Sequence, residues 1–241
     1  MTLTGKTILI TGASRRLGKA MALFCAEKGA DLIIHYNSSE SEATKVKEAI
    51  NRIGRNCWLV KADLNDNLSV THLFDTVASF SHIDALINNA SIFKPVKMME
   101  TTIDDWETHL RVNLTAPFLL TQSFGRQYSG DRAGRVINLV DWRALRPGKD
   151  HFPYTISKAG LVALTKASAL SLAPRIIVNA IALGAILPPE NEPENLGILK
   201  PVPMQRWAEM DELRKTVEFL LDGPEYITGE VIHLDGGRHL V

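Results

Sequence analysis

The sequence contains few of the features that membrane, secreted or nucleic-acid-binding proteins need. It has only two cysteines, Cys25 and Cys57, which lack metal-ligand spacing and lie in apolar surroundings, as buried free thiols usually do. No apolar run is long enough to cross a bilayer, and no export signal precedes the first apolar run. The 27 basic and 27 acidic residues cancel, and no basic run could follow a phosphate backbone. These absences predict a reduced, cytoplasmic protein without a membrane or nucleic-acid partner.

The chain does contain a regular alternation of strand and helix patterns. Apolar runs rich in β-branched residues predict strands at residues 6–12, 31–36, 56–61, 84–89, 134–140, 175–182 and 230–235. Helical spacing follows the first run up to Gly29 and recurs at residues 39–53, 67–80, 103–127, 154–172 and 209–221. Asn65 or Asp66 is the predicted cap of the helix over residues 67–80, and Pro117 is the predicted site of a kink in the helix over residues 103–127. Strands that are apolar throughout predict a parallel sheet covered on both faces. The pattern predicts one doubly wound α/β domain of the Rossmann type over residues 1–241.

The first predicted turn from strand to helix has the composition of an anion-binding loop. It reads Thr11-Gly12-Ala13-Ser14-Arg15-Arg16-Leu17-Gly18. Gly12 permits a tight turn, Gly18 permits close packing of the helix on the sheet, and the helix N-terminus offers free amides to a pyrophosphate. Glycine in a loop is weak evidence alone, but here a strand precedes the turn and a helix follows it.

Tyr154 and Lys158 form a candidate acid–base pair. Four residues apart on a predicted helix, they lie on the same face, where the ammonium would lower the pKa of the phenol. A tyrosine tuned in this way suits general acid–base catalysis near neutral pH. In isolation the pair could equally be a chance combination on a solvated helix.

Taken in order, these motifs resemble the short-chain dehydrogenase/reductase family over essentially the whole chain. Asn88-Asn89-Ala90 matches a family segment beside the adenosine, Asn113 matches its helix asparagine, and Tyr154 with Lys158 its catalytic pair. The sequence departs from the family pattern at Arg16, Ser91 and Leu183, which replace two glycines and a proline. The resemblance implies catalytic roles for Asn113, Tyr154 and Lys158. It implies cofactor contacts for Gly12, Ser14, Arg15, Arg16, Leu17, His35, Tyr36, Asn37, Ser38, Ser39, Asp63, Leu64, Asn89, Ala90, Tyr154, Lys158 and Gly184.

The charge pattern predicts NADPH as the cofactor. An NAD-preferring site places a carboxylate after the second strand to hold the ribose hydroxyls, but no acid follows that strand here until Glu40. Arg15 and Arg16 add two positive charges beside the glycine turn. Their sign is unfavourable at a helix N-terminus, which favours an anion such as a 2′-phosphate over simple surface decoration.

Asp141 stands where the family usually has a catalytic serine, and this change resembles the pteridine reductase branch, including the bacterial dihydromonapterin reductases. That branch implies NADPH-dependent reduction of a pterin or folate at CH–NH groups by a homotetramer. It also implies substrate contacts for Phe93, Arg16 and Ser91, with Phe93 stacking the pterin against the nicotinamide, and a catalytic role for Asp141. Taken singly, Phe93 could be a packing aromatic and Asp141 a turn cap.

Two alternatives remain open from the sequence. One is a ketone or 3-oxoacyl-thioester reductase of the same fold, with Asp141 an incidental change. The other is a nucleotide-sensing binding protein that has lost turnover, against which the intact Asn113, Tyr154 and Lys158 argue. Residues 184–208, rich in proline and charge, predict a flap over the substrate. The seven histidines show no ligand pairing, which predicts a protein without a metal.

Overall fold

A single seven-stranded sheet runs through the computed structural model, which describes residues 3–188 and 196–241. All neighbouring strands are parallel, in the order β3-β2-β1-β4-β5-β6-β7. The strands are β1 (Thr7–Ile10), β2 (Asp31–Tyr36), β3 (Cys57–Lys61), β4 (Ala85–Asn88), β5 (Gly134–Asp141), β6 (Ile176–Leu183) and β7 (Val231–Leu234). The predicted doubly wound fold is confirmed. Its strand order reverses between β1 and β4, which is where such sheets bind ligands.

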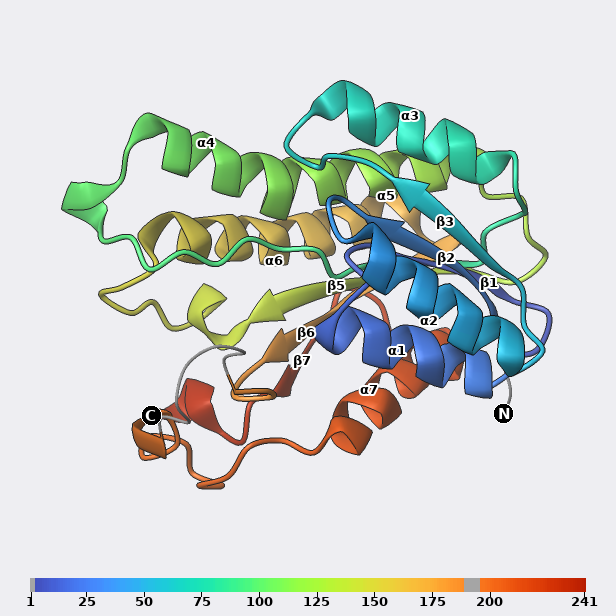
Figure 1. Ribbon diagram of the computed structural model, residues 1–241. Coiled ribbons are helices and arrows are strands. Elements are labelled where there is room, and N and C mark those ends of the chain that lie inside the picture. The colour runs from blue at the N-terminus through green and yellow to red at the C-terminus, as the bar shows by residue number, and fades with distance from the viewer. Residues whose placement is uncertain (1–2, 189–195) are drawn as a thin grey trace.

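Helices cover both faces of this sheet, as Figure 1 shows. One layer contains α1, α2 and α7, and the other contains α3, α4, α5 and α6. Their bounds are α1 (Arg16–Glu27), α2 (Glu40–Arg52), α3 (Asn67–Ala78), α4 (Ile103–Leu110), α5 (Ala116–Gln127), α6 (Phe152–Leu172) and α7 (Met210–Asp222). Asp66 caps α3 through the backbone amides of Leu68 and Ser69, so it is the cap of the two predicted candidates.

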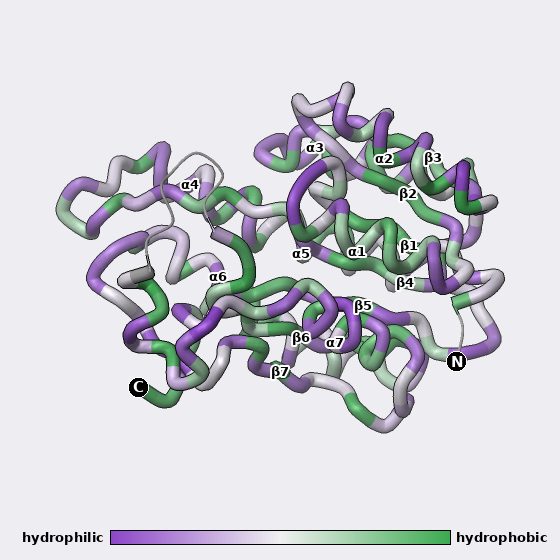
Figure 2. The backbone as a smooth tube through the Cα atoms, turned by 60° about the horizontal axis from the view of Figure 1, so that its bottom comes forward, coloured by the Kyte–Doolittle hydropathy of each residue, from purple (hydrophilic) through white to green (hydrophobic). Residues whose placement is uncertain are grey.

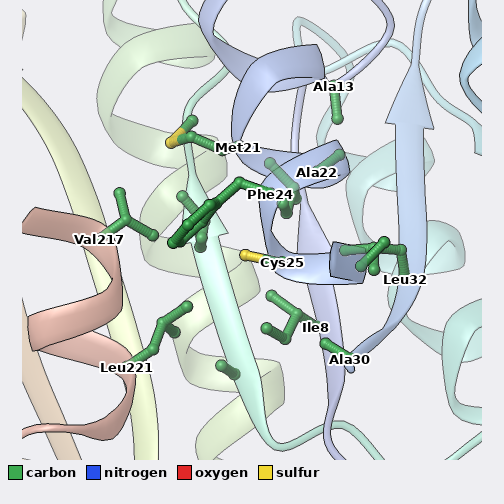
Figure 3. Close-up of a cluster of buried hydrophobic side chains, with 14 of the residues drawn as sticks. Ile8, Ala13, Met21, Ala22, Phe24, Cys25, Ala30, Leu32, Val217 and Leu221 are labelled. Atoms are coloured by element: carbon green, nitrogen blue, oxygen red, sulfur yellow. The ribbon is translucent and has the colours of Figure 1, made fainter. Parts of the chain in front are cut away.

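The five inner strands are buried between these layers, which explains their continuous apolar composition, whereas the edge strands β3 and β7 are partly exposed. Figure 2 shows the hydrophobic colour running along β1, β2 and β3 inside the molecule. In Figure 3, Met21, Phe24 and Cys25 of α1 lie between the sheet and Val217 and Leu221 of α7. Both cysteines are free and buried, and burial raises the pKa of each thiol to about 12. They are therefore packing residues rather than reactive thiols.

The predicted helix over residues 103–127 differs from expectation at its centre. Helices α4 and α5 are separated by a π-helical segment, η2 (Arg111–Thr115), so the irregularity precedes Pro117. Pro117 lies in the first turn of α5, where a missing amide hydrogen costs little. A π-turn inside a helix often marks a functional site, and this one contains Asn113.

Two predictions fall partly outside what the structure describes. Residues 189–195 of the predicted flap are not among the described residues, so the flap over residues 184–208 stays a prediction, as does the homotetramer. The described start of this segment contacts the glycine turn, because Arg16 Nη2 donates a hydrogen bond to the Pro188 carbonyl at 3.1 Å.

In the described ranges, no helix combines the length and apolarity that a membrane crossing requires. Over the same ranges, no three His, Cys, Asp or Glu side chains converge on a common point where a metal could sit.

Candidate active site

Hydrogen bonds join the glycine turn to the end of β4 across the point where the strand order reverses. The Thr11 hydroxyl accepts from the backbone amides of Asn89 and Ala90 at 2.9 and 3.0 Å. The Asn89 side-chain amide in turn donates to the carbonyls of Thr11 and Gly12 at 2.8 and 3.1 Å. The Asn88-Asn89-Ala90 segment therefore holds the backbone of the turn in place, and the amides at the start of α1 are left for a ligand.

Two glycines make this turn possible. Gly12 adopts φ 62°, and a Cβ on Gly18 would lie 2.3 Å from the Gly12 carbonyl oxygen. Arg16 also adopts a positive φ, 49°, which explains why glycine is usual at this position. Arg15 is exposed, and its side chain makes no hydrogen bond within the described chain. No acid lies in the first turn of α1, so the turn presents amides and positive charge together.

The buried His35 side chain supports this turn, and the cofactor contact predicted for this residue stays a prediction. Its side chain is buried, and its Nδ1 accepts from the Gly12 amide at 3.1 Å. Because Nδ1 is an acceptor, Nε2 carries the hydrogen and donates to the Ala62 carbonyl at 3.1 Å. Burial lowers the pKa of His35 to about 4, so the ring is neutral at pH 7.

The remaining predicted cofactor residues divide between exposed and buried side chains. Asn37 and Ser38 are exposed beyond the carboxyl end of β2, and the Asn37 amide donates to Asp63 Oδ1 at 3.5 Å. Ser39 is half-buried ahead of α2. The side chains of Ser14, Leu17, Tyr36 and Leu64 are buried or pack against the core. Gly184 follows β6, where its amide donates to the Leu234 carbonyl and a Cβ would lie 2.5 Å from the Asp235 Cα.

Asn113 clamps the loop after β4 through its side chain, and its predicted catalytic role stays a prediction. Its Oδ1 accepts from the Ile92 amide and the Ser91 hydroxyl at 2.9 and 3.1 Å. Its Nδ2 donates to the Ile92 carbonyl and the Ser157 hydroxyl at 3.1 and 3.0 Å. The fully buried side chain has no group left for a substrate and positions the loop that carries Ser91 and Phe93 against α6.

The structure brings Tyr154, Lys158 and Asp141 together at the carboxyl end of β5. The Tyr154 hydroxyl donates to Asp141 Oδ2 at 3.1 Å, and Asp141 Oδ1 accepts from the Arg143 amide at 2.8 Å. Lys158 Nζ donates to the Leu139 carbonyl at 2.8 Å and lies 5.8 Å from the centre of the Tyr154 ring. The direct partner of the phenol is therefore the carboxyl group rather than the ammonium.

This arrangement corrects the expectation that Lys158 lowers the pKa of Tyr154. Burial raises the pKa of the phenol well above 10, and the neighbouring Asp141 carboxylate raises it further. Burial also lowers the pKa of Lys158 to about 8, against the opposing effect of Asp141. The pKa of Asp141 is raised by its own burial. The charge of Arg143 lowers the pKa of the phenol but does not offset burial and Asp141.

On one wall of the site, the predicted Phe93 lies beside His151, Arg143 and Asp150, which sequence reasoning missed. The exposed Phe93 ring stacks on His151 at 4.0 Å between centroids and meets Tyr154 edge-on at 4.7 Å. His151 adopts φ 53°, and its Nδ1 lies 3.0 Å from Asp150 Oδ2 but makes no hydrogen bond. The Arg143 guanidinium bonds Asp150 at 3.3 Å and lies 5.9 Å from the Phe93 ring. The one feature of the sequence that could have pointed to Arg143, Asp150 and His151 is their position between Asp141 and Tyr154.

Chemically, the site combines an anion-binding turn with a buried proton donor at the same sheet edge. The turn fits a dinucleotide, because it supplies free amides, positive side chains and close backbone approach. Tyr154 and Asp141 can hold and transfer a proton, and Phe93, 53% exposed, offers a flat ring to a flat substrate. This combination suits reduction by hydride and proton transfer.

Comparisons with known proteins agree with that reading. A family model described as Enoyl-(Acyl carrier protein) reductase matches residues 12–239. The 3-oxoacyl-(acyl-carrier-protein) reductase of Synechocystis sp. is 34% identical over 98% of this chain and 97% of its own length. The FolM alternative dihydrofolate reductase 1 from Brucella canis, solved with NADP, is 35% identical at a TM-score of 0.92 and covers 100% of this chain and 97% of its own. A Serratia marcescens short-chain dehydrogenase/reductase is 30% identical at a TM-score of 0.92, over 99% of this chain and 100% of its own.

Proposed function

The chain belongs to the short-chain dehydrogenase/reductase family and is an oxidoreductase, and on that premise we propose that it reduces a pterin or folate with NADPH. The observation that carries the proposal is the hydrogen bond of 3.1 Å between the Tyr154 hydroxyl and the Asp141 carboxyl group. A carboxyl group occupies the place where the family usually has a serine hydroxyl. The similarity to a structure named as an alternative dihydrofolate reductase supports the same assignment.

The residues of the glycine turn fit NADPH, which supplies a hydride when bound. Gly12 and Gly18 allow its phosphates to approach the backbone, and the amides of α1 would hold them. Arg15 would meet a 2′-phosphate, since its side chain makes no hydrogen bond elsewhere in the described chain. Asn37 and Ser38 provide neutral polar groups beside it where an NAD-preferring site would have an acid.

Tyr154 and Asp141 would supply the proton that the reduction consumes. Reducing the C=N bond of a dihydropterin places a hydride on carbon and requires a proton on the adjacent nitrogen. Tyr154 touches Asp141 on one side and the Phe93 ring on the other, so a substrate lying on Phe93 would be within reach of the phenol. Asp141, with its pKa raised by burial, can hold a proton nearer to neutral pH than an exposed aspartate.

A second candidate is reduction of a 3-oxoacyl thioester, because the curated relatives from Synechocystis sp. and Aquifex aeolicus carry that name at 34% identity each. A ketone reductase stabilises a developing alkoxide and needs a neutral hydroxyl near Tyr154. An ionised Asp141 at that position would repel the alkoxide. In the pterin reaction the negative charge would develop on a ring nitrogen that takes up a proton, and a protonated Asp141 would help supply that proton, so Asp141 favours the first candidate.

The two candidates separate in an assay of NADPH oxidation with dihydrobiopterin, dihydrofolate and an acetoacetyl thioester side by side. We expect turnover of at least one of the two pteridines. In the same assay, Phe93→Ala should raise the KM for the pteridine about tenfold, because a stacked aromatic contributes about 0.5–1.5 kcal/mol beyond its buried area. Phe93→Tyr keeps the ring and should restore the KM. Activity on the thioester alone would overturn the proposal in favour of the second candidate.

NADPH should bind more tightly than NADH. A hydrogen bond between a charged donor such as Arg15 and the 2′-phosphate contributes about 1.5–3 kcal/mol, which corresponds to roughly tenfold to a hundredfold in the dissociation constant. Titration of the intrinsic fluorescence with each nucleotide measures the difference, and Arg15→Gln should reduce it. Equal constants for the two nucleotides, or a preference for NADH, would contradict the prediction.

A further inference from the structure

Two arginines, Arg143 and Arg238, lie over the Trp142 ring next to the proposed substrate site, and the backbone amide of Arg146 donates to the Trp142 carbonyl. We refer to Arg143, Arg146 and Arg238 as the arginine cluster. The guanidinium carbons of Arg143 and Arg238 lie 4.7 and 4.4 Å from the centre of the Trp142 ring. Trp142 begins the short helix η3 (Trp142–Ala144), and Arg238 begins η5 (Arg238–Leu240). The two helices are in contact although they lie far apart in the sequence.

Among the described residues, the positive charge of this cluster exceeds the charge of the acidic side chains that pair with it. Within residues 3–188 and 196–241, Asp150 is the one acidic side chain paired with a cluster member, and it leaves the buried Arg143 Nε without a hydrogen bond. Arg238 donates to the backbone oxygens of Pro201 and Val241 at 3.5 and 3.3 Å, and the Arg146 side chain makes no hydrogen bond within the described residues.

The pKa of Arg238 agrees with an excess of positive charge. Burial lowers it first, and the charges of Arg146 and Arg143 lower it further. Asp235 opposes this effect, but its Oδ2 already accepts from His239 at 2.7 and 2.8 Å. An anion bound here would relieve the mutual repulsion of the three guanidinium groups.

The cluster begins next to the ring proposed to stack the substrate. Arg143 lies 5.9 Å from the centre of Phe93, and its backbone amide bonds the catalytic candidate Asp141. From there the cluster extends through Trp142 to η5, near the C-terminal end of the chain in Figure 1. The arginine cluster therefore lies close to the Phe93 ring, within reach of a long substituent on a substrate stacked there.

We propose that the arginine cluster binds the carboxylates of a substrate tail, so that the preferred substrate is a reduced pterin with an acidic tail, such as the p-aminobenzoyl-glutamate of a folate. This inference rests on the proposed pterin reductase function. Planar guanidinium groups suit carboxylates because they can donate two parallel hydrogen bonds to one acid. A small pterin with a neutral side chain would leave the cluster unused.

Inhibition by methotrexate and by its dimethyl ester tests the charge without changing the size of the ligand. Wild-type protein should bind the acid about tenfold more tightly than the ester at low salt, a difference of about 1.4 kcal/mol. The ratio should shrink at high ionic strength, because the cluster is partly exposed. The ratio of the affinity for methotrexate to the affinity for its dimethyl ester should approach one in Arg143→Gln and in the double variant Arg146→Gln with Arg238→Gln. Arg52→Gln, the same charge change at the end of α2, should keep the wild-type ratio.

Dihydrobiopterin, which lacks the acidic tail, separates a failure of this inference from a failure of the proposed function. If dihydrobiopterin is reduced but the wild type binds methotrexate and its ester equally, the inference is overturned and the function stands. A wild-type preference for the acid that survives in both cluster variants would also overturn it, since the charge would then be recognised elsewhere. If neither pteridine is reduced, the proposed function falls and this inference falls with it.

Discussion

Replacement of Tyr154 by phenylalanine is expected to lower kcat for pteridine reduction about a thousandfold while leaving NADPH binding nearly unchanged. Positioned general acids contribute about a hundredfold to ten-thousandfold to a rate, and the phenol is the group of the pair that also contacts Phe93. The substitution removes one hydroxyl and keeps the ring that meets Phe93 edge-on. Steady-state kinetics and a fluorescence titration with NADPH measure the two effects separately.

Tyr226→Phe is the matched control for this prediction. It removes the same hydroxyl from a fully exposed tyrosine between α7 and β7, so kcat and nucleotide binding should both stay at wild-type values. Near-full activity of Tyr154→Phe would show that the proton reaches the substrate by another route. Equal loss in both variants would point to a general effect on the fold.

The arrangement of strands and helices could be predicted because burial dictates it locally. A strand covered on both faces must be apolar at successive positions, as residues 31–36 illustrate, and those bounds agree with β2 residue for residue. The glycine turn was equally readable, since Gly12 and Gly18 occupy positions that a Cβ would disturb. These are properties of neighbouring residues, which sequence spacing records directly.

The electrostatics of the site could not be predicted from spacing alone. Tyr154 and Lys158 are on one helical face, as expected, but the Lys158 ammonium reaches the Leu139 carbonyl of β5. Burial then raises the pKa of the phenol instead of lowering it. Both effects depend on which strand packs against α6 and on how much water is excluded, and a one-turn spacing contains neither piece of information.

The hydrogen-bond partners of His35 and Asn113 could not be predicted for a related reason. Each lies in the expected element, but its hydrogen-bond partners come from distant segments: Gly12 and Ala62 for His35, Ile92 and Ser157 for Asn113. A polar side chain beside a site can contact the ligand or support the residues that do. Only the three-dimensional partners distinguish these two roles.

Asp141→Asn is expected to lower kcat/KM for the pteridine about a hundredfold at mildly acidic pH and to change the pH profile. The raised pKa of Asp141 means that the carboxyl group keeps its proton to a higher pH than an exposed aspartate would. If the protonated carboxyl group feeds Tyr154, wild-type kcat/KM is highest below that pKa and falls as the pH rises through it. Asparagine cannot ionise, so this fall should disappear in the variant, which pH–rate profiles of both proteins would reveal.

Thermal melts distinguish this loss of a proton donor from a loss of structure. The pKa of Asp141 is raised above its unfolded value, so the folded state binds the proton more strongly than the unfolded chain does. Its contribution to stability is therefore favourable at low pH and is lost as the pH rises from the unfolded pKa through the folded one. Ionised Asp141 thus costs stability at neutral pH, and Asp141→Asn should melt at the same temperature as the wild type or higher.

A variant that is stable, binds NADPH and has lost the pH-dependent step would identify Asp141 as part of the proton path. An unchanged pH profile with full activity would make Asp141 a turn cap, as its hydrogen bond to the Arg143 amide alone would suggest.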